Sequence, residues 1–267
     1  MVKRVITTVV GLPIFIAIIA MGGLWLRVTL LVLSLIGLYE FYKALSPKIL
    51  TIHFVGYFFA ALYFLVVIEY GVHAYLLVML SAFILITQAT LVIYYQKISF
   101  KDCLVTICGF FYVPFLLSFV YFVRDHNVYF VWLILISASA SDTFAYLIGR
   151  VWGRHKLTGT PSPGKSWEGC IGGILGAAVI GFIYGYLVVH FAGINHPMVI
   201  NAMAVSIMGA IFSQLGDLFA SAIKRSVEIK DFGKILPGHG GVLDRFDSII
   251  VAAPVVYMVM IVMLKGM

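Results

Sequence analysis

Apolar stretches long enough to cross a lipid bilayer follow one another along almost the whole chain. About 20 apolar residues in a helix cross a bilayer. The runs between charged residues or Gly/Pro breaks give nine candidate spans, at about 5–21, 27–45, 53–70, 74–95, 103–123, 129–149, 170–190, 198–223 and 246–264. Only 11% of the 267 residues are charged, against about 25% in soluble domains. Because backbone in lipid must satisfy its own hydrogen bonds, we predict an all-α polytopic membrane protein.

The distribution of lysine and arginine indicates the orientation of these spans. With nine spans and a cytoplasmic N-terminus, fifteen of the 18 Lys and Arg residues fall on the inner side, and only Arg27, Arg124 and Lys265 fall outside. Cytoplasmic loops carry such an excess of positive charge. We therefore expect a cytoplasmic N-terminus and an outside C-terminus. We also expect an N-terminal region of about five spans, 1–125, and a C-terminal region, 126–267, with two polar cytoplasmic loops.

Polar residues gather in two islands in the C-terminal region, 139–169 and 214–248. These islands hold seven of the 11 acidic residues, namely Asp142, Glu168, Asp217, Glu228, Asp231, Asp244 and Asp247. Asp142 and Asp217 lie inside apolar segments, where an ionised carboxylate is costly and by default functional. The pattern is typical of a membrane-embedded enzyme that holds a cation.

A polar stripe crosses the second island. Ser213, Asp217, Ser221 and Lys224 are spaced i, i+4, i+8 and i+11, so they share one face of a helix. Such a face must turn toward protein or a water-filled cavity. For Ser213 and Ser221, hydrogen bonding between packed helices is an equally good interpretation, whereas a structural role for Asp217 would require a buried cation beside it.

A glycine-rich turn follows, with the sequence Pro-Gly-His-Gly-Gly at 237–241. Its backbone N–H groups suit phosphate oxygens. Asp244 and Asp247 come next, three residues apart on one helix face. Because magnesium prefers carboxylate oxygens and leaves positions open for substrate phosphates, these two and Asp217 are candidate metal ligands. Helix capping is the alternative for one of the pair, and His239 fits a phosphate donor, an acid–base group or a structural turn residue.

The first island combines a polar helix face with a basic loop. Asp142, Tyr146 and Arg150 recur at every fourth residue, and Ser141 precedes them. Lys165-Ser166 resembles the end of a P-loop, but no strand precedes it, which argues against a Walker A motif. A basic loop with hydroxyls suits a polyphosphate. Arg154 and Lys156 fit an ordinary cytoplasmic loop equally well, so Lys165 is the stronger candidate for phosphate binding.

Taken together, these motifs resemble the phosphatidate cytidylyltransferases, also called CDP-diacylglycerol synthases. The segment 221–247 reads SAIKRSVEIKDFGKILPGHGGVLDRFD, with the Ser-x-x-Lys-Arg, Lys-Asp, Pro-Gly-His-Gly-Gly and Asp-Arg-x-Asp elements of that family. Ser141-Asp142-Thr143 and SPGKSWEG at 162–169 agree with it as well. The resemblance is dense over about 139–250. One departure is Gly164-Lys165-Ser166, where family members often have Lys-Lys-Thr.

The resemblance implies that CTP and phosphatidic acid react to give CDP-diacylglycerol and pyrophosphate. It further implies a homodimer and dependence on Mg²⁺, and it allows a second, monovalent cation such as K⁺. Carried onto this chain, the implied metal ligands are Asp217, Asp244 and Asp247, with Asp142 nearby. No side-chain nucleophile is needed, because phosphatidate supplies its own.

The same resemblance, with the charge pattern, divides the candidate residues by role. The candidate catalytic residues are Asp217, Asp244, Asp247, Lys224 and Arg225. The candidate substrate-binding residues are Lys165, Ser166, Ser221, His239, Gly240, Gly241, Arg245, Asp142 and Ser141.

The alternatives are another CTP-dependent lipid enzyme, such as an isoprenoid-alcohol kinase or a CDP-archaeol-type synthase, and a cation-coupled transporter. Transport is less favoured because the polar residues gather at one side of the membrane rather than through its depth. We expect CTP, phosphatidic acid and membrane lipid as partners, and no nucleic acid. We expect the protein in the cell inner membrane or its equivalent, with the active site facing the cytoplasm.

Overall fold

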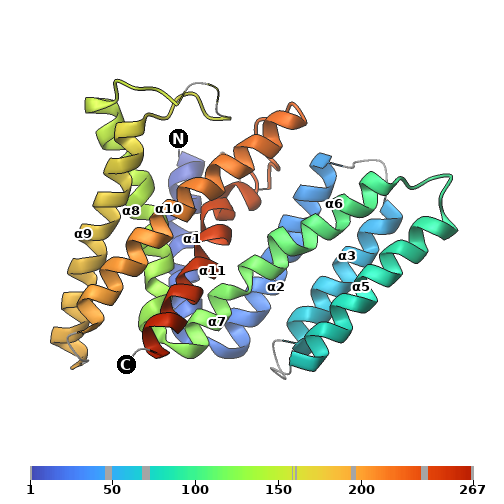
Figure 1. The fold of residues 1–267 in the computed structure, drawn as a ribbon, viewed down its shortest axis with the longest axis horizontal. Helices are drawn as coiled ribbons and strands as arrows, with labels where there is room; N and C mark the ends of the chain where they lie inside the picture. The colour runs from blue at the N-terminus through green and yellow to red at the C-terminus, as the bar shows by residue number, and fades with distance from the viewer. Residues whose placement is uncertain are drawn as a thin grey trace. The chain divides into compact units, whose positions relative to one another are not determined.

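The computed structural model describes residues 2–45, 50–67, 73–157, 159, 161–193, 197–235 and 240–265. All named elements in these ranges are helices (Figure 1). In chain order they are α1 (Val2–Met21), α2 (Gly23–Leu45), α3 (Leu50–Leu62), η1 (Tyr63–Val67), α5 (His73–Ile93), α6 (Phe100–Phe110), η2 (Phe111–Phe115), α7 (Phe119–His126), α8 (Val128–Trp152), α9 (Trp167–Ala192), α10 (Pro197–Ser226) and α11 (Leu243–Lys265).

The prediction of an all-helical membrane protein is confirmed. Among the described residues, seven helical stretches are long and apolar enough to cross a membrane: Gly23–Leu45, Tyr75–Ile93, Phe100–His126, Val128–Trp152, Trp167–Ala192, Pro197–Ser226 and Leu243–Leu264. A shorter apolar helix covers Ile52–Val66, and α1 lies where the first span was predicted. The count of nine spans and the orientation of the termini stay predictions.

The helical stretch Phe100–His126 contains a proline, and its geometry shows how the proline is accommodated. Pro114 lies within η2, a π-helical turn between α6 and α7. A proline inside a helix lacks an N–H donor, and its ring presses against the carbonyl group four residues earlier. Widening to a π-helix relieves that contact. The chain therefore continues as one apolar span through the proline.

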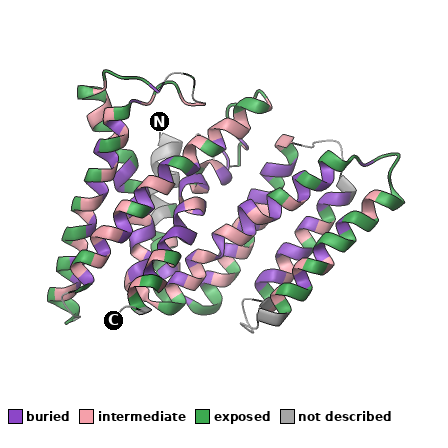
Figure 2. Cartoon of the chain, viewed as in Figure 1, coloured by how far each residue is buried: buried purple, intermediate pink, exposed green. Residues whose placement is uncertain are grey.

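Exposed residues recur along α9, coloured green in Figure 2, and several of them are large and apolar. Ile171, Leu175, Val179 and Tyr186 are all more than half exposed. In a soluble protein so large an exposed apolar face would be unusual, whereas in a membrane it faces acyl chains. The burial pattern thus supports the same conclusion as the composition.

The chain divides into two compact units, and the first comprises Met1–Ser118 and Ile229–Arg245. Within it, α2, α3, α5 and α6 pack side by side (Figure 1). Tyr42 of α2 is buried, and its hydroxyl donates to the carbonyl oxygen of Thr106 in α6 at 3.0 Å. Because Gly56 and Gly109 carry no side chain, the Tyr42 ring fits closely against the backbone at both positions.

The second unit comprises Phe119–Glu228 and Phe246–Met267. Its centre is a close packing of α8, α9 and α10 (Figure 1). A Cβ atom on Gly173 of α9 would lie 2.7 Å from the Ser141 carbonyl oxygen and 2.8 Å from the Gln214 side-chain nitrogen. Both distances are too short for real contacts, so a larger residue would push the helices apart. The glycine brings α8 and α10 close to the same part of α9.

Candidate active site

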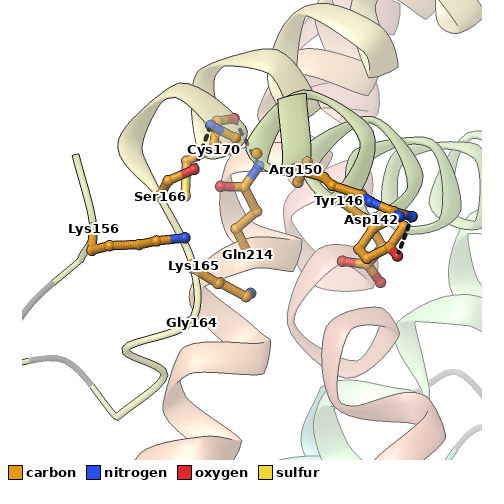
Figure 3. Close-up of a pocket in the computed structure, with 12 residues that line it drawn as sticks. Asp142, Tyr146, Arg150, Lys156, Gly164, Lys165, Ser166, Cys170 and Gln214 are labelled. Carbon is orange, nitrogen blue, oxygen red and sulfur yellow. Dashed lines mark hydrogen bonds between the residues drawn. The ribbon is translucent and has the colours of Figure 1, made fainter. Parts of the chain in front are cut away.

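A pocket of about 300 Å³ lies in the second unit, on the polar residues of the first island (Figure 3). Helix α8 contributes Asp142, Tyr146 and Arg150. The loop before α9 contributes Lys156, Lys165 and Ser166, and α10 contributes Gln214. In Figure 3 the α8 side chains stand opposite Lys156, with Lys165 and Gln214 between them. Cationic, acidic and amide groups therefore face one cavity.

The loop between α8 and α9 turns back on itself through backbone hydrogen bonds. The Leu157 N–H donates to the Lys165 carbonyl oxygen at 2.9 Å, and the Trp167 N–H donates to the His155 carbonyl oxygen at 3.0 Å. His155 also binds Glu168, since its Nδ1 lies 2.5 Å from Oε1 of that carboxylate. This arrangement directs both Lys156 and Lys165 to the pocket.

The same loop settles the P-loop comparison. Residues 159–166, GTPSPGKS, do fit the spacing G-x-x-x-x-G-K-S. A P-loop follows a strand, whereas helix α8 precedes this segment. Ser166 is the N-cap of α9, and its hydroxyl accepts a hydrogen bond from the Gly169 N–H at 3.2 Å. A preceding helix and a serine that caps α9 therefore distinguish this segment from a Walker A motif.

Lys165 and Asp217 form an ion pair, and their side chains are 27% and 29% exposed. Asp142 on α8 lies within electrostatic range of both. The structure thus brings together three of the predicted site residues, from α8, from α10 and from the intervening loop. An ion pair that water reaches contributes little to stability, about 0–1 kcal/mol. Lys165 and Asp217 can therefore each take another charged partner at a small cost in free energy.

Gln214 is a pocket residue that the sequence patterns did not single out. Its side-chain nitrogen donates to the Ser141 hydroxyl at 2.9 Å and to the Cys170 carbonyl oxygen at 3.0 Å. Because a carbonyl only accepts, the Cys170 contact identifies the nitrogen end of the amide. Gln214 thereby joins α8, α9 and α10 beneath the pocket. Its position three residues before Asp217, on the same side of the helix, was the signal that could have revealed it.

The other predicted site residues of α10 differ in how far they are buried. Ser213 is buried, and its hydroxyl has no hydrogen-bond partner among the described residues. Ser221 and Lys224 are half-buried, and Arg225 is exposed. These residues all lie on one helix, α10, as predicted. Their roles toward a substrate stay predictions.

Asp244 and Asp247 both lie in the first turns of α11 but have different surroundings. One Asp244 oxygen, Oδ2, accepts from the Gly241 N–H at 3.0 Å and from the Phe232 N–H at 2.9 Å, within the first unit. Asp247 is buried in the second unit, and its Oδ1 accepts from the Ser248 N–H at 2.7 Å. These two bonds close the turn that precedes α11.

The structure brings some of the four predicted metal ligands near one another without forming a metal site in the part of the chain that it describes. Among the described residues, no three His, Cys, Asp or Glu side chains lie close enough together to hold a metal ion. Asp247 does approach the Asp217 region, because a Cβ atom on Gly216 would lie 2.7 Å from the Asp247 carbonyl oxygen. The four proposed ligands Asp142, Asp217, Asp244 and Asp247 stay a prediction.

The glycine-rich turn is described in part. His239 lies outside the described residues, as do 236–238. Gly240 has φ +82°, a left-handed conformation that glycine adopts without strain. Gly241 is buried and Arg245 is exposed. Glu228 and Asp231 are exposed.

Glu40 of α2 is the second residue that the sequence patterns missed. It is 1% exposed, and its two carboxylate oxygens accept from the Val242 and Leu243 N–H groups at 3.1 and 2.8 Å. The available signal was an acidic residue close to the end of an apolar span. Its partners lie about 200 residues away in the chain, so no local spacing pointed to them.

In an all-helical membrane protein, a pocket lined by lysine, arginine and aspartate has the chemistry of membrane enzymes that handle phosphorylated substrates. Comparison with known sequences gives the family. The model of the cytidylyltransferase family matches residues 2–263, so the chain belongs to that family.

Three similar proteins that match over nearly their whole length are phosphatidate cytidylyltransferases. The protein of Staphylococcus haemolyticus (strain JCSC1435) is 31% identical over 264 residues, which are 97% of this chain and 99% of the relative. The protein of Staphylococcus epidermidis (strain RP62A) is 32% identical over 262 residues, 97% and 98% of the two chains. The protein of Staphylococcus aureus (strain COL) is 30% identical over 262 residues, which are 97% of this chain and 98% of the relative. The resemblance seen over about 139–250 is confirmed and extends along the chain.

Proposed function

We propose that this chain is a phosphatidate cytidylyltransferase, which converts CTP and phosphatidic acid to CDP-diacylglycerol and pyrophosphate in phospholipid biosynthesis. The observation that carries the proposal is the end-to-end similarity to enzymes of that name, 31% over 97% of this chain for the Staphylococcus haemolyticus protein. The pocket adds chemical support, because it combines Arg150, Lys156 and Lys165 with carboxylates.

The reaction requires little covalent chemistry from the protein. A phosphate oxygen of phosphatidic acid attacks the α-phosphorus of CTP, the bond from that phosphorus to the bridging oxygen of the β-phosphate breaks, and pyrophosphate leaves. Both reactants are anionic, so catalysis depends on positioning them and on offsetting their repulsion. The side chains of the pocket are suited to that task.

Lys165 is the proposed phosphate contact in the pocket. Its ion pair with Asp217 is partly exposed, so a phosphate can replace the carboxylate at a cost of about 1 kcal/mol or less. Lys156 and Arg150, which donates to the Tyr146 hydroxyl at 3.3 Å, line the same cavity and offer further positive charge. Binding of CTP would thereby release the Asp217 carboxylate for a cation.

Magnesium is the proposed cofactor, with Asp217, Asp244, Asp247 and Asp142 as its proposed ligands. The donor set fits the ion chemically, because Asp142 and Asp217 offer hard carboxylate oxygens within electrostatic range of each other. A bound divalent cation would neutralise charge on the phosphates and on the departing pyrophosphate. A second, monovalent cation such as K⁺ is part of the same proposal.

The other predicted contacts keep their proposed roles. Lys224 and Arg225 are proposed catalytic cations, and Ser221, His239, Gly240, Gly241 and Arg245 are proposed substrate-binding residues. Ser141 and Ser166 have hydrogen bonds that order the pocket, which supports a role in shaping the substrate site.

The proposed membrane arrangement has nine spans, a cytoplasmic N-terminus and an outside C-terminus, in the cell inner membrane or its equivalent. It is supported by the excess of lysine and arginine on the inner side. The pocket then opens to the cytoplasm, where CTP is found, and phosphatidic acid enters from the bilayer. A homodimer is the proposed assembly.

Radiolabelled CTP tests the function directly. Purified protein is incubated with phosphatidic acid in mixed micelles and with CTP labelled at either the α- or the γ-phosphate. A cytidylyltransferase places only the α-label in lipid, whereas a lipid kinase places the γ-label there. Ether-linked phosphatidic acid as sole acceptor tests a CDP-archaeol-type synthase. Absence of α-label from the lipid would refute the proposed function.

A further inference from the structure

Glu40 is a buried carboxylate to which the proposed chemistry assigns no role. An ionisable group in apolar surroundings is costly unless it is bonded. Both oxygens of Glu40 are bonded: Oε1 accepts from the Val242 N–H at 3.1 Å, and Oε2 accepts from the Leu243 N–H at 2.8 Å. These two N–H groups stand at the start of α11, which begins at Leu243.

The start of α11 lacks a capping side chain of its own. The first N–H groups of a helix have no partner within the helix, and a Ser, Thr, Asp or Asn directly before it usually binds them. That position is occupied by Val242, which has no polar side chain. Glu40 supplies the missing acceptor from α2, and its negative charge also suits the positive end of the helix dipole.

Two glycines enclose the Glu40 carboxylate. A Cβ atom on Gly241 would lie 2.6 Å from the carboxyl carbon of Glu40, and one on Gly233 would lie 2.9 Å from its Cγ. Neither position therefore tolerates a side chain while Glu40 stays in place. The segment before α11 is shaped closely around this one carboxylate.

The same segment also holds Asp244. The Gly241 N–H donates to Asp244 Oδ2 at 3.0 Å, so Gly241 contacts both carboxylates. The second donor to that oxygen is the Phe232 N–H. The Phe232 ring stacks on the ring of Phe41, the residue after Glu40, with 6.5 Å between the ring centroids. Because the two carboxylates share these supports, displacement of Glu40 also disturbs Asp244.

We infer that Glu40 is a positioning residue that fixes the turn 240–243 and, through it, the orientation of Asp244. The inference rests on the proposed function only in giving Asp244 a part in metal binding. It assigns to the N-terminal region a direct part in building the catalytic segment, through a contact that spans more than 200 residues of chain.

Hydrogen–deuterium exchange tests the structural half of the inference. Glu40→Gln keeps the size of the side chain but replaces one acceptor oxygen by an amide nitrogen, which cannot accept from a backbone N–H. We expect backbone amides of 240–245 to exchange roughly tenfold to hundredfold faster, as the loss of a hydrogen bond to a charged group implies. Peptides from α9 should be unchanged. Unchanged exchange at 240–245 would overturn the inference.

Ser34→Ala is the matched control. Ser34 lies in the same helix, is fully buried, and has no hydrogen-bond partner among the described residues. Its replacement should leave exchange at 240–245 as in the wild-type protein. Accelerated exchange there in Ser34→Ala would mean that any change in α2 loosens the turn, and would also overturn a specific role for Glu40.

Magnesium titration tests the functional half. In Glu40→Gln we expect the Mg²⁺ concentration for half-maximal activity to rise about tenfold, which is roughly the effect of losing one hydrogen bond. A variant that merely folds less well would lose amplitude without moving the half-maximal concentration. Faster exchange with an unmoved Mg²⁺ requirement would overturn the link to Asp244.

The two proposals fail in different ways. Wild-type protein that places no α-label in lipid refutes the proposed function, while the exchange comparison between wild type and Glu40→Gln is still measured on inactive protein. Wild-type activity with unchanged exchange in Glu40→Gln refutes the inference and leaves the cytidylyltransferase standing.

Discussion

The carboxylates of the pocket and those of the turn before α11 differ in what neutralises them. Asp217 is paired with the side chain of Lys165, and both are more than a quarter exposed. Glu40 and Asp244 are instead held by backbone N–H groups. A side chain can rotate away when a substrate arrives, whereas backbone N–H groups can leave only if the turn changes conformation. The pocket is therefore built for exchange of partners, and the turn for a constant shape.

The largest expected effect comes from removing divalent cations, which tests whether the exchangeable pocket carboxylates serve a metal. A chelator such as EDTA should reduce α-label transfer to background, because the anionic phosphates would then face each other and the carboxylates without a divalent counterion. Readdition of Mg²⁺ should restore the wild-type rate. Transfer that persists in excess chelator would rule out the proposed metal.

Asp217→Asn should have the next largest effect. The substitution removes a proposed ligand charge, and we expect kcat to fall by roughly 10³-fold or more, equivalent to several kcal/mol of transition-state stabilisation. Because the ion pair with Lys165 is partly exposed, thermal stability in detergent should change by about 1 kcal/mol or less. Near-normal turnover would mean that Asp217 is not a ligand, and the exchangeable ion pair in the pocket would then have no part in catalysis.

Gly173→Ala tests the close helix packing beneath the pocket. The new Cβ atom would meet the Ser141 carbonyl oxygen at 2.7 Å, so we expect a loss of about 1–3 kcal/mol in the free energy of unfolding and a lower activity. Thermal unfolding in detergent measures the loss of stability. Gly11→Ala is the control, since a Cβ atom there meets nothing within 4 Å among the described residues outside its own stretch of helix. Equal stability of the two variants would contradict the packing argument.

Glu228→Gln should have the smallest effect. Glu228 is exposed, in the turn after α10, and neither the pocket nor the turn before α11 uses it. We expect kcat and KM for CTP within about twofold of wild type, as for most surface substitutions. A severe loss in the α-label assay would show that the charged residues between α10 and α11 take part in the reaction.

Local spacing predicted those parts of the site that one helix can define. The face shared by Asp217, Ser221 and Lys224 follows from the 3.6-residue period of α10, and the polar face of α8 follows in the same way. The whole-chain family membership also agrees with motifs read from the polar islands. What spacing left open was the partner of each side chain, as Gln214 illustrates by bonding to two other helices.

The sequence by itself determined the apolar spans, the polar islands and the family, because these depend on composition and on the order of neighbouring residues. Only the tertiary structure decided that Lys165 meets Asp217 and that Glu40 holds the start of α11. Helices from distant parts of the chain must pack before such groups come within hydrogen-bond distance. That packing depends on glycines such as Gly173 and Gly241, whose importance lies in what they allow to approach rather than in any side chain of their own.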